Sequence, residues 1–419
     1  MKKHILLLFL GLCSIAAKGQ TYETRIFNPD IKTLQIYPEG RQDGFPILEI
    51  NGNGRLIVSF DEMVFSERTF YYKIVHCNRN WQKSPLSEME YYDGFTENKI
   101  TEVNLSENTV KNYTNYRFEI SNKPFKASGN YAVLISGNSD FTRPDAIARF
   151  YVLDRNISID TKATSKTSIG LNTQYQQLEI EINNYGYNIQ NPFSELNLYV
   201  MQNRRTDNMA KDIKPTFTTI DKQTYSNNNN LIFEGGNEYR FIDFSDEYSY
   251  SGEVEKIDIK HDRYNLFTMP AYPRNRQFVP ENYGNGYGHY IINRKNYRQN
   301  DYNADYMQVN FVLPDNLDFY NYDIYILGDV FGNRLDETSK MELLRESGIR
   351  HKSVLLKQGG YSFLYAFVPK NSSQTKATLI PFEGSFWQTS NEYIVLAYHT
   401  PFGAKYDHLA GAQIFFSKM

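Results

Sequence analysis

The sequence predicts an all-β protein made of several immunoglobulin-like β-sandwich domains in tandem. Tyr (34) and Phe (28) are abundant among its 419 residues, and aromatic residues suit the half-buried surface of a sheet. Short apolar runs alternate with Gly, Asn and Ser turns at roughly 8–12-residue spacing, which is typical of sandwiches. The length exceeds that of one hydrophobic core and indicates about two to four domains.

Residues 1–19 have the order of a secretory signal peptide. Two lysines precede an apolar run, and Ala17 and Gly19 are the small residues ahead of the cleavage point. The apolar stretch is shorter than the roughly 20 residues that cross a bilayer, so an N-terminal anchor is disfavoured. The leucine before Cys13 argues against a lipoprotein. We expect an exported chain that begins at Gln20 and has no membrane span.

The charge of the exported chain excludes two classes of partner. The leader contains three lysines and no acid, so the 45 basic residues fall to 42 against 48 acidic ones, a net charge of −6. Nucleic-acid binders need a basic face, and anionic lipid surfaces attract basic segments. Neither partner is expected.

Cys77 is the single cysteine left after the leader. No internal disulfide and no cysteine-based zinc site is therefore possible. Burial as a small apolar side chain is the preferred interpretation. The alternative is a reactive thiol activated by His76, but adjacent strand residues point to opposite faces.

The first domain is expected at 20–155. Turn residues separate its apolar runs, as in the Asn-Gly-Asn-Gly stretch at 51–54. The expected strands are 47–51, 55–60, 69–77, 115–121, 130–136 and 148–153.

A middle β-rich domain is expected at 156–304. Leu178, Ile180 and Ile182 alternate with glutamates, which predicts a strand with one buried and one wet face. The chain then enters a long loop at 270–289, rich in Pro, Gly, Asn and Tyr. Loops of this length in compact domains are usually functional or mobile.

A C-terminal sandwich is expected at 305–419. Met307, Val309, Phe311 and Leu313 alternate mostly with polar residues, and further apolar runs follow to the end of the chain. Residues 339–346 are the only helix candidate in this block.

No set of residues forms a recognisable active site. The six histidines after the leader lack the spacing of metal ligands. The glycines at 284–288 lack the lysine and the helix of a phosphate-binding loop. Trp81 and Trp387 are candidate sugar-stacking platforms, although buried tryptophans are commoner in sandwiches. We expect no enzyme activity, no cofactor and no metal.

Several segments, in order along the chain, together resemble one family. They are YYKIVHCNRNW at 71–81, YDGF at 92–95, SGNY at 128–131, GHYI at 288–291, DY at 305–306, LLKQGGY at 355–361, EGSF at 383–386 and NEY at 391–393. In these segments the chain resembles the plug protein of the bacterial type IX secretion system, and they span nearly the whole exported chain.

This resemblance implies a function and a location. Family members are periplasmic and bind the periplasmic end of the outer-membrane translocon barrel, where they block the pore while no shuttle partner occupies it. The family has no catalytic motif. The implied location is the periplasm, with attachment to the outer membrane through a protein partner.

The long loop supplies the candidate partner-binding residues. Interfaces favour Tyr and Arg, and the loop and its flanks contain many of both. The candidates are Tyr272, Arg274, Arg276, Tyr283, Tyr287, His289, Tyr290, Arg294 and Tyr297. The alternative is an ordered Tyr-rich loop folded over its own sheet.

Two rival functions remain open. The segments IYILGD at 324–329 and GYSF at 360–363 are loosely similar to the starch-binding sandwich module, which implies a periplasmic carbohydrate-binding protein. Exposed flat aromatic residues on one sheet face would favour that function. An enzyme whose acidic residues meet across domains is the second rival, and a cleft lined by two carboxylates would favour it.

Overall fold

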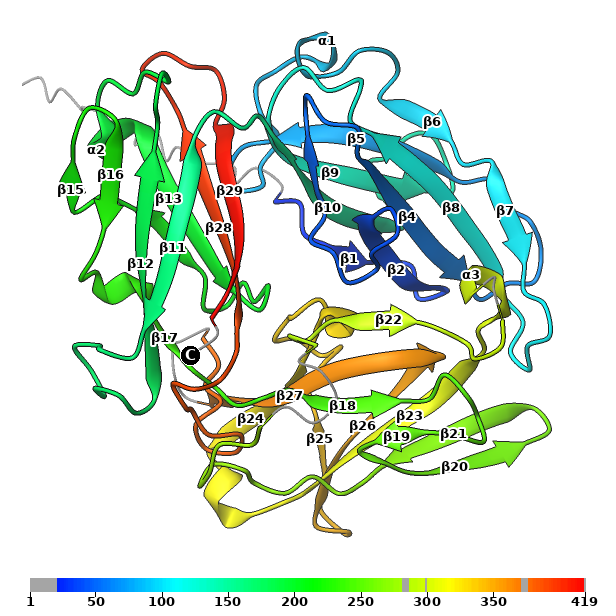
Figure 1. The fold of residues 1–419 in the computed structure, drawn as a ribbon. Coiled ribbons are helices and arrows are strands. Elements are labelled where there is room, and N and C mark those ends of the chain that lie inside the picture. The colour runs from blue at the N-terminus through cyan, green and yellow to red at the C-terminus, as the bar shows by residue number, and fades with distance from the viewer. Residues whose placement is uncertain (1–20, 281–285, 298–299, 371–375, 418–419) are drawn as a thin grey trace, which may run out of the picture.

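The computed structural model describes residues 21–280, 286–297, 300–370 and 376–417. Strands dominate these residues and form six sheets, arranged as three lobes (Figure 1). We call them lobe 1 (25–153), lobe 2 (158–234 and 392–416) and lobe 3 (240–369). The prediction of an all-β chain with several sandwiches is confirmed. The predicted signal peptide, residues 1–19, lies outside the described residues.

Lobe 1 is a sandwich of a six-stranded and a four-stranded sheet. In β8, Tyr116, Phe118 and Ile120 are buried while Glu119 is exposed, so the alternation of the sequence directs one face to the core. The first sheet contains β1 (Arg25–Ile26), β3 (Ile47–Glu49), β5 (Tyr71–Cys77), β6 (Glu97–Lys99), β9 (Gly129–Ser136) and β10 (Ala146–Leu153). The second contains β2 (Ile31–Pro38), β4 (Arg55–Glu62), β7 (Glu102–Leu105) and β8 (Thr114–Ser121).

Lobe 2 combines two distant parts of the chain. The alternation predicted around Leu178, Ile180 and Ile182 is present, with all three side chains buried. One sheet contains β11 (Ser158–Thr164), β12 (Tyr175–Asn183), β15 (Phe217–Thr218), β16 (Lys222–Tyr225) and β17 (Ile232–Glu234). The other contains β13 (Leu196–Gln202), β14 (Ala210–Ile213), β28 (Glu392–His399) and β29 (His408–Phe416).

Lobe 3 is inserted between β17 and β28 of lobe 2. Val309 and Phe311 of one sheet and Ile324 and Phe363 of the other share a single core. One sheet contains β18 (Arg240–Asp243), β19 (Ser251–Gly252), β22 (Tyr290–Ile292), β24 (Tyr322–Leu327) and β27 (Gly359–Pro369). The other contains β20 (Val254–Lys260), β21 (Arg263–Thr268), β23 (Tyr306–Pro314), β25 (Glu342–Leu344) and β26 (Ile349–Lys357).

The predicted boundary between domains 156–304 and 305–419 is wrong. Strands β18 to β21 belong to the same lobe as β23 to β27, and β13 pairs along its whole length with β28. The fully buried run of β28 needs apolar contacts on both faces, and its flanking cores lie in lobe 2 and at lobe 1. Strand β28 therefore pairs with a strand that is distant in the sequence, because only there are both of its faces covered.

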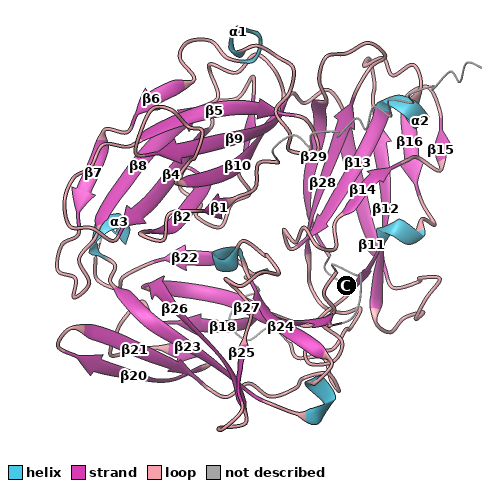
Figure 2. Cartoon of the chain, turned by 180° about the vertical axis from the view of Figure 1, so that it is seen from behind, coloured by secondary structure: helices cyan, strands magenta, loops and turns pink. Residues whose placement is uncertain are grey.

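Helices are few and short (Figure 2). They are α1 (Glu88–Tyr91), α2 (Pro192–Glu195), α3 (Asn300–Asn303) and the 3₁₀ turns η1 (Asn229–Leu231), η2 (Leu317–Phe319) and η3 (Asp329–Phe331). The helix predicted at 339–346 is wrong, because strand β25 occupies its centre and pairs with β26. Three apolar residues there satisfy a helical spacing by chance. No helix among the described residues has the length and apolarity to cross a membrane.

The lobes are joined by buried contacts. Val75 and Leu134 of lobe 1 share an apolar cluster with Leu396 and Tyr398 of lobe 2. Between lobes 1 and 3 the contact is ionic, and Lys357 Nζ lies 2.6 Å from the Asp61 carboxylate with both side chains buried. Such contacts hold the lobes in one arrangement.

Candidate functional site

The predicted partner-binding loop is divided by the structure into exposed and buried residues. Tyr272 and Arg276 are exposed, and Tyr297 is at the border of exposure. The other described candidates are buried or half-buried and contact the protein itself: Arg274, Tyr287, His289, Tyr290 and Arg294. Tyr283 lies outside the described residues. The loop is therefore in part a packed structural segment.

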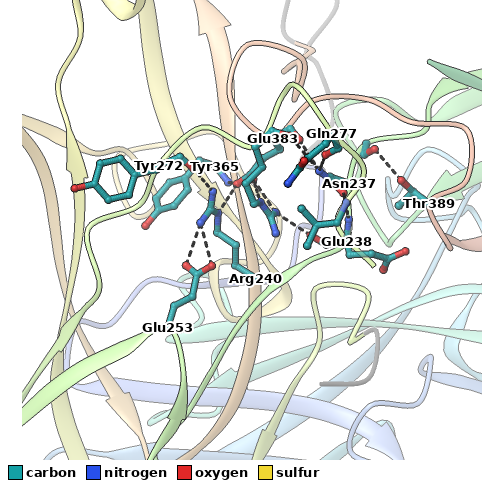
Figure 3. Close-up of polar contacts among 12 residues, drawn as sticks. Asn237, Glu238, Arg240, Glu253, Tyr272, Gln277, Tyr365, Glu383 and Thr389 are labelled. Carbon is teal, nitrogen blue, oxygen red and sulfur yellow. Dashed lines mark hydrogen bonds and ion pairs between the residues drawn. The ribbon is translucent and has the colours of Figure 1, made fainter. Parts of the chain in front are cut away.

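Arg274 is held by the buried carboxylate of Glu383, and Figure 3 shows Glu383 beside Arg240. Glu383 Oε2 lies 2.7 Å from Arg274 Nη2, and Oε1 lies 2.9 Å from Arg240 Nε. Burial alone would raise the pKa of Glu383, but the two guanidinium groups lower it. The backbone N–H of Tyr365 also donates to this carboxylate. Glu383 thus stays ionised and ties the loop to strand β27.

Asn237 fixes the next part of the loop through its side-chain amide (Figure 3). Its Nδ2 donates to the backbone carbonyls of Glu383 (2.9 Å) and Gln277 (3.3 Å). Its Oδ1 accepts from the backbone N–H of Val279 at 3.0 Å. The side-chain amide of Asn237 thereby supplies hydrogen-bond partners to backbone groups of this loop, which do not pair with a neighbouring strand.

His289 lies in a charged network where all three lobes meet. Its Nδ1 is 2.7 Å from Asp329 and its Nε2 is 3.1 Å from Glu392. Arg204 lies 3.2 Å from both carboxylates and also donates to the backbone carbonyl of Asp43 in lobe 1. Burial is the largest single influence and disfavours the imidazolium form, but Asp329 and Glu392 together outweigh it and raise the pKa of His289 to about 9. The charged ring links lobe 2 to lobe 3.

The last members of the predicted set also make internal contacts. The Tyr290 ring stacks on Tyr361 at 5.3 Å between centroids, and its hydroxyl donates to the carbonyl of Leu34 in lobe 1. Arg294 donates to the carbonyl of Asn108 in lobe 1 at 2.7 Å. These residues join lobes, which is a structural role that composition alone does not reveal.

The segments that carry the family resemblance also meet at the lobe contacts. Arg79 Nη1 lies 2.6 Å from Asp407 in the β28–β29 loop of lobe 2. Tyr306 donates its hydroxyl hydrogen to Asp61 at 2.5 Å. With Lys357 and the His289 network, these contacts show that much of the resemblance concerns how the lobes are held together.

A cavity of about 800 Å³, which we call the central cavity, lies where the three lobes meet. Its walls include Phe45, Trp81 and Arg149 from lobe 1, Tyr199 from lobe 2 and Arg334 from lobe 3. Trp81 and Arg149 lie together there, with the guanidinium carbon 4.3 Å from the ring centroid. The cavity wall is mixed, with aromatic surface beside charged groups.

Large apolar side chains protrude from one end of lobes 1 and 2, which we call the end face. Phe402 is 99% exposed, Ile220 87% and Phe95 85%. The end face also includes Met89, Tyr185 and Phe193.

The segments of the end face are joined to one another, and Figure 1 shows α1 and α2 at the same end of the molecule. The β28–β29 loop contacts lobe 1 through Lys405, which lies 2.7 Å from Glu90 in α1. The same loop contacts α2 through the backbone bond from Thr400 to Glu195. Large exposed apolar residues on segments at the same end of the molecule make this end a candidate protein-interaction surface.

Sequence reasoning did not find the end face, although a signal was present. Phe402 lies between Pro401 and Gly403, and Phe95 follows Gly94. A large apolar residue beside turn-forming residues is a candidate exposed tip. The pattern is common, however, and only the fold shows that these turns share one end.

The aromatic residues expected of a carbohydrate platform are covered. Tyr361 and Phe363 are buried in the core of lobe 3, Trp81 is buried beneath Arg149, and Trp387 is half-buried. Their burial counts against sugar stacking on a flat sheet face.

The two catalytic alternatives, a reactive thiol and acidic residues that meet in a cleft, can be compared with the described residues. Burial raises the pKa of the Cys77 thiol to about 12, so its thiolate is scarce near neutral pH. In the described part of the chain, no group of three or more His, Cys, Asp or Glu side chains is placed to hold a metal ion. The central cavity is lined by four carboxylates. Asp207, Asp329 and Asp336 form ion pairs with arginines, whereas Glu23 is exposed and forms no ion pair in the described structure.

Comparison with known proteins agrees with the resemblance. Residues 31–154 match the family model described as type 9 secretion system plug protein, 1st domain. The crystal structure of a hypothetical protein from Parabacteroides merdae is 32% identical, with a TM-score of 0.90, over 95% of this chain and 100% of that chain. No curated protein matches.

The family match indicates a role in type IX secretion, in the cell envelope and in association with a secretion translocon. The matched segment is lobe 1, and the similar structure extends the likeness through lobes 2 and 3. The chain belongs to the type IX secretion system plug protein family.

Proposed function

We propose that this protein binds the periplasmic side of the outer-membrane translocon barrel and closes its pore when no shuttle partner is bound. It acts as a non-enzymatic component in the periplasm, attached to the outer membrane through its partner. The family match supports this function, and the buried lobe contacts supply the stiffness that a plug needs. A body that bent between its lobes would seal a wide opening poorly.

The observation that carries the proposal is the end face. Full burial of a phenylalanine or isoleucine side chain is favourable by about 1.5–3 kcal/mol of free energy. Phe402, Ile220 and Phe95 are exposed and do not gain this free energy within the chain. Burial of these tips against a protein rim would recover that free energy. Acidic residues such as Glu88 and Asp93 lie among the tips, which disfavours an anionic lipid surface as the contact.

The exposed part of the long loop is a second candidate surface. Tyr272, Arg276 and Tyr297 remain available to a partner, and residue types of this kind anchor interfaces. They belong to lobe 3 and its loop, whereas the end face belongs to lobes 1 and 2. The two surfaces can therefore be tested separately.

The binding test compares two variants of the tagged, full-length protein. One carries Phe95→Ser, Ile220→Ser and Phe402→Ser, and the other carries Tyr272→Ser and Arg276→Ser. Each is used to capture the translocon from detergent-solubilised envelopes. We expect the end-face variant to lose capture and the loop variant to keep it. The reverse result would place the contact on the loop instead of the end face. Failure of the wild-type protein to capture the translocon would contradict the proposal.

Pore closure needs its own measurement. The purified translocon barrel is placed in a planar bilayer, and its conductance is recorded as the protein is added to one side. We expect stepwise loss of conductance with wild-type protein and much weaker closure with the end-face variant. Binding without any loss of conductance would leave an envelope partner but contradict a plug.

A further inference from the structure

The central cavity contains an arginine whose charge is not matched by a carboxylate. Arg149 lies on strand β10 and donates through Nε to the backbone carbonyl of Tyr22. Among the described residues, no carboxylate lies within ion-pair distance of it. Glu23 also lines the cavity, but it is exposed and forms no ion pair with Arg149 in the described structure.

Three other arginines of the cavity wall differ in this respect, and the remaining one, Arg25, is exposed and forms no ion pair in the described structure. Arg79 is paired with Asp407, Arg204 with Asp329 and Glu392, and Arg334 with Asp336 at 3.0 Å. A half-buried cation without a counter-charge is unfavourable. Burial accordingly lowers the pKa of the Arg149 guanidinium. The unmatched charge therefore calls for an anion.

The aromatic surroundings of Arg149 are built around it. Its guanidinium lies over the Trp81 ring, and Trp81 packs edge-on against Tyr151, with centroids 5.2 Å apart. Phe45 stacks on Tyr151 at 5.0 Å. A guanidinium supported on one face by a ring keeps its edge free for a planar anion.

Trp81 adopts a backbone conformation that is unusual for a bulky residue. Its φ is +64°, in the left-handed region that costs about 1–3 kcal/mol for such side chains. The turn is held by Asn78, whose side-chain oxygen accepts from the backbone N–H groups of Asn80 and Gln82 at 3.0 Å. Strain of this kind is retained where the surroundings fix it, often at a binding site.

From this geometry we propose that the central cavity binds an apolar group that carries one carboxylate. The carboxylate pairs side by side with the terminal nitrogens of Arg149, the geometry that arginine favours. The apolar body lies against Phe45, Tyr151 and the Met201 side chain on the cavity wall. The volume of about 800 Å³ is within the roughly 300–1,000 Å³ of small-ligand sites. This inference does not depend on the plug function.

Two sources can supply such a group, and the test separates them. One is a small aromatic acid, probed with 3-phenylpropionate against its amide. The other is a free polypeptide C-terminus with an apolar last residue, probed with Gly-Gly-Phe against the same peptide amidated. The probes are titrated into the full exported chain by isothermal calorimetry.

Tryptophan fluorescence supplies an independent readout. Trp81 and Trp387 are the only tryptophans in the sequence, so a Trp387→Phe background reports on Trp81. We expect at least one carboxylate probe to bind and change this signal, and its amide to bind about tenfold more weakly or not at all. Equal binding of acid and amide, or no saturable binding of either acid at millimolar concentration, would overturn the proposal.

Substitution gives the second check. Arg149→Gln removes the charge, and Arg149→Lys keeps the charge but loses the paired geometry. We expect both variants to bind the acid probe about tenfold or more weakly than the unsubstituted protein does. The exposed Arg25 of the same wall is the control, and Arg25→Gln should leave affinity within about twofold. Thermal melts identify any unfolded variant, and the acid-versus-amide comparison on unsubstituted protein then decides alone.

Discussion

The ion pair between Lys357 and Asp61 gives the sharpest test of how lobes 1 and 3 are joined. The two groups are 2.6 Å apart, and their side chains are 2% and 1% exposed. The Asp61 carboxylate also accepts hydrogen bonds from the Tyr306 hydroxyl and from Asn115 Nδ2 at 2.8 Å. Lys357→Met removes the cation, keeps most of the side-chain volume and leaves the carboxylate buried.

The burial of this pair determines how much folding stability Lys357→Met should remove. Removing one partner of a buried pair destabilises proteins by about 3–5 kcal/mol. Two hydrogen bonds to Asp61 remain, so we expect the lower end, about 3 kcal/mol. Restoring neutrality with Asp61→Asn in the same chain should recover more than half of this loss. The exposed pair of Lys405 with Glu90 is the control, and Lys405→Met should change stability by less than about 1 kcal/mol.

The assay is urea unfolding of the single and double variants, followed by circular dichroism. Burial raises the pKa of Asp61 even with Lys357 present, and the variant lacks the cation that opposes this. A raised native pKa favours folding at low pH and disfavours it as pH rises. The penalty of Lys357→Met should therefore be smaller at pH 5 than at pH 8. Single-variant losses that simply add in the double variant would refute the coupling.

Two further predictions concern single residues. The His289 pKa of about 9 lies above its unfolded value of about 6.5, so its stabilisation should be complete below pH 6.5 and lost as pH rises towards 9. His289→Gln should flatten this dependence of the urea midpoint, and an unchanged slope would contradict the assignment. The raised pKa of buried Cys77 predicts slow reaction of the leaderless chain with a thiol reagent at pH 8 and rapid reaction in denaturant. Rapid labelling of native protein would show an accessible thiolate.

Local patterns predicted much of the strand content, because each pattern depends on burial of one face. Leu178, Ile180 and Ile182 alternate in sequence and are buried in the structure. The partner of a strand depends on distant residues, however. In β28 the run from Tyr393 to Tyr398 is wholly buried, which indicates covering on both faces but does not identify β13 as its neighbour.

The candidate site was predictable only in part for a related reason. Composition directed attention to the Tyr- and Arg-rich loop, but an arginine that anchors an interface and one that neutralises a buried acid look alike in sequence. Arg274 is of the second kind because Glu383, far along the chain, lies beneath it. The sequence does not show that Arg149 has no carboxylate within ion-pair distance in the described structure, because the position of every acidic residue relative to Arg149 depends on the fold.

The insertion of lobe 3 into lobe 2 has a consequence for the order of folding. Strand β13 pairs with β28 along its whole length, so half of lobe 2 cannot be completed until nearly the entire chain has been delivered. Lobes 1 and 3 are each continuous in sequence and can form earlier. Until β28 and β29 arrive, β13 presents an open edge that invites pairing with other chains. A protein of this topology can finish folding only when its last strands are available, and these late strands determine how long it remains vulnerable to aggregation.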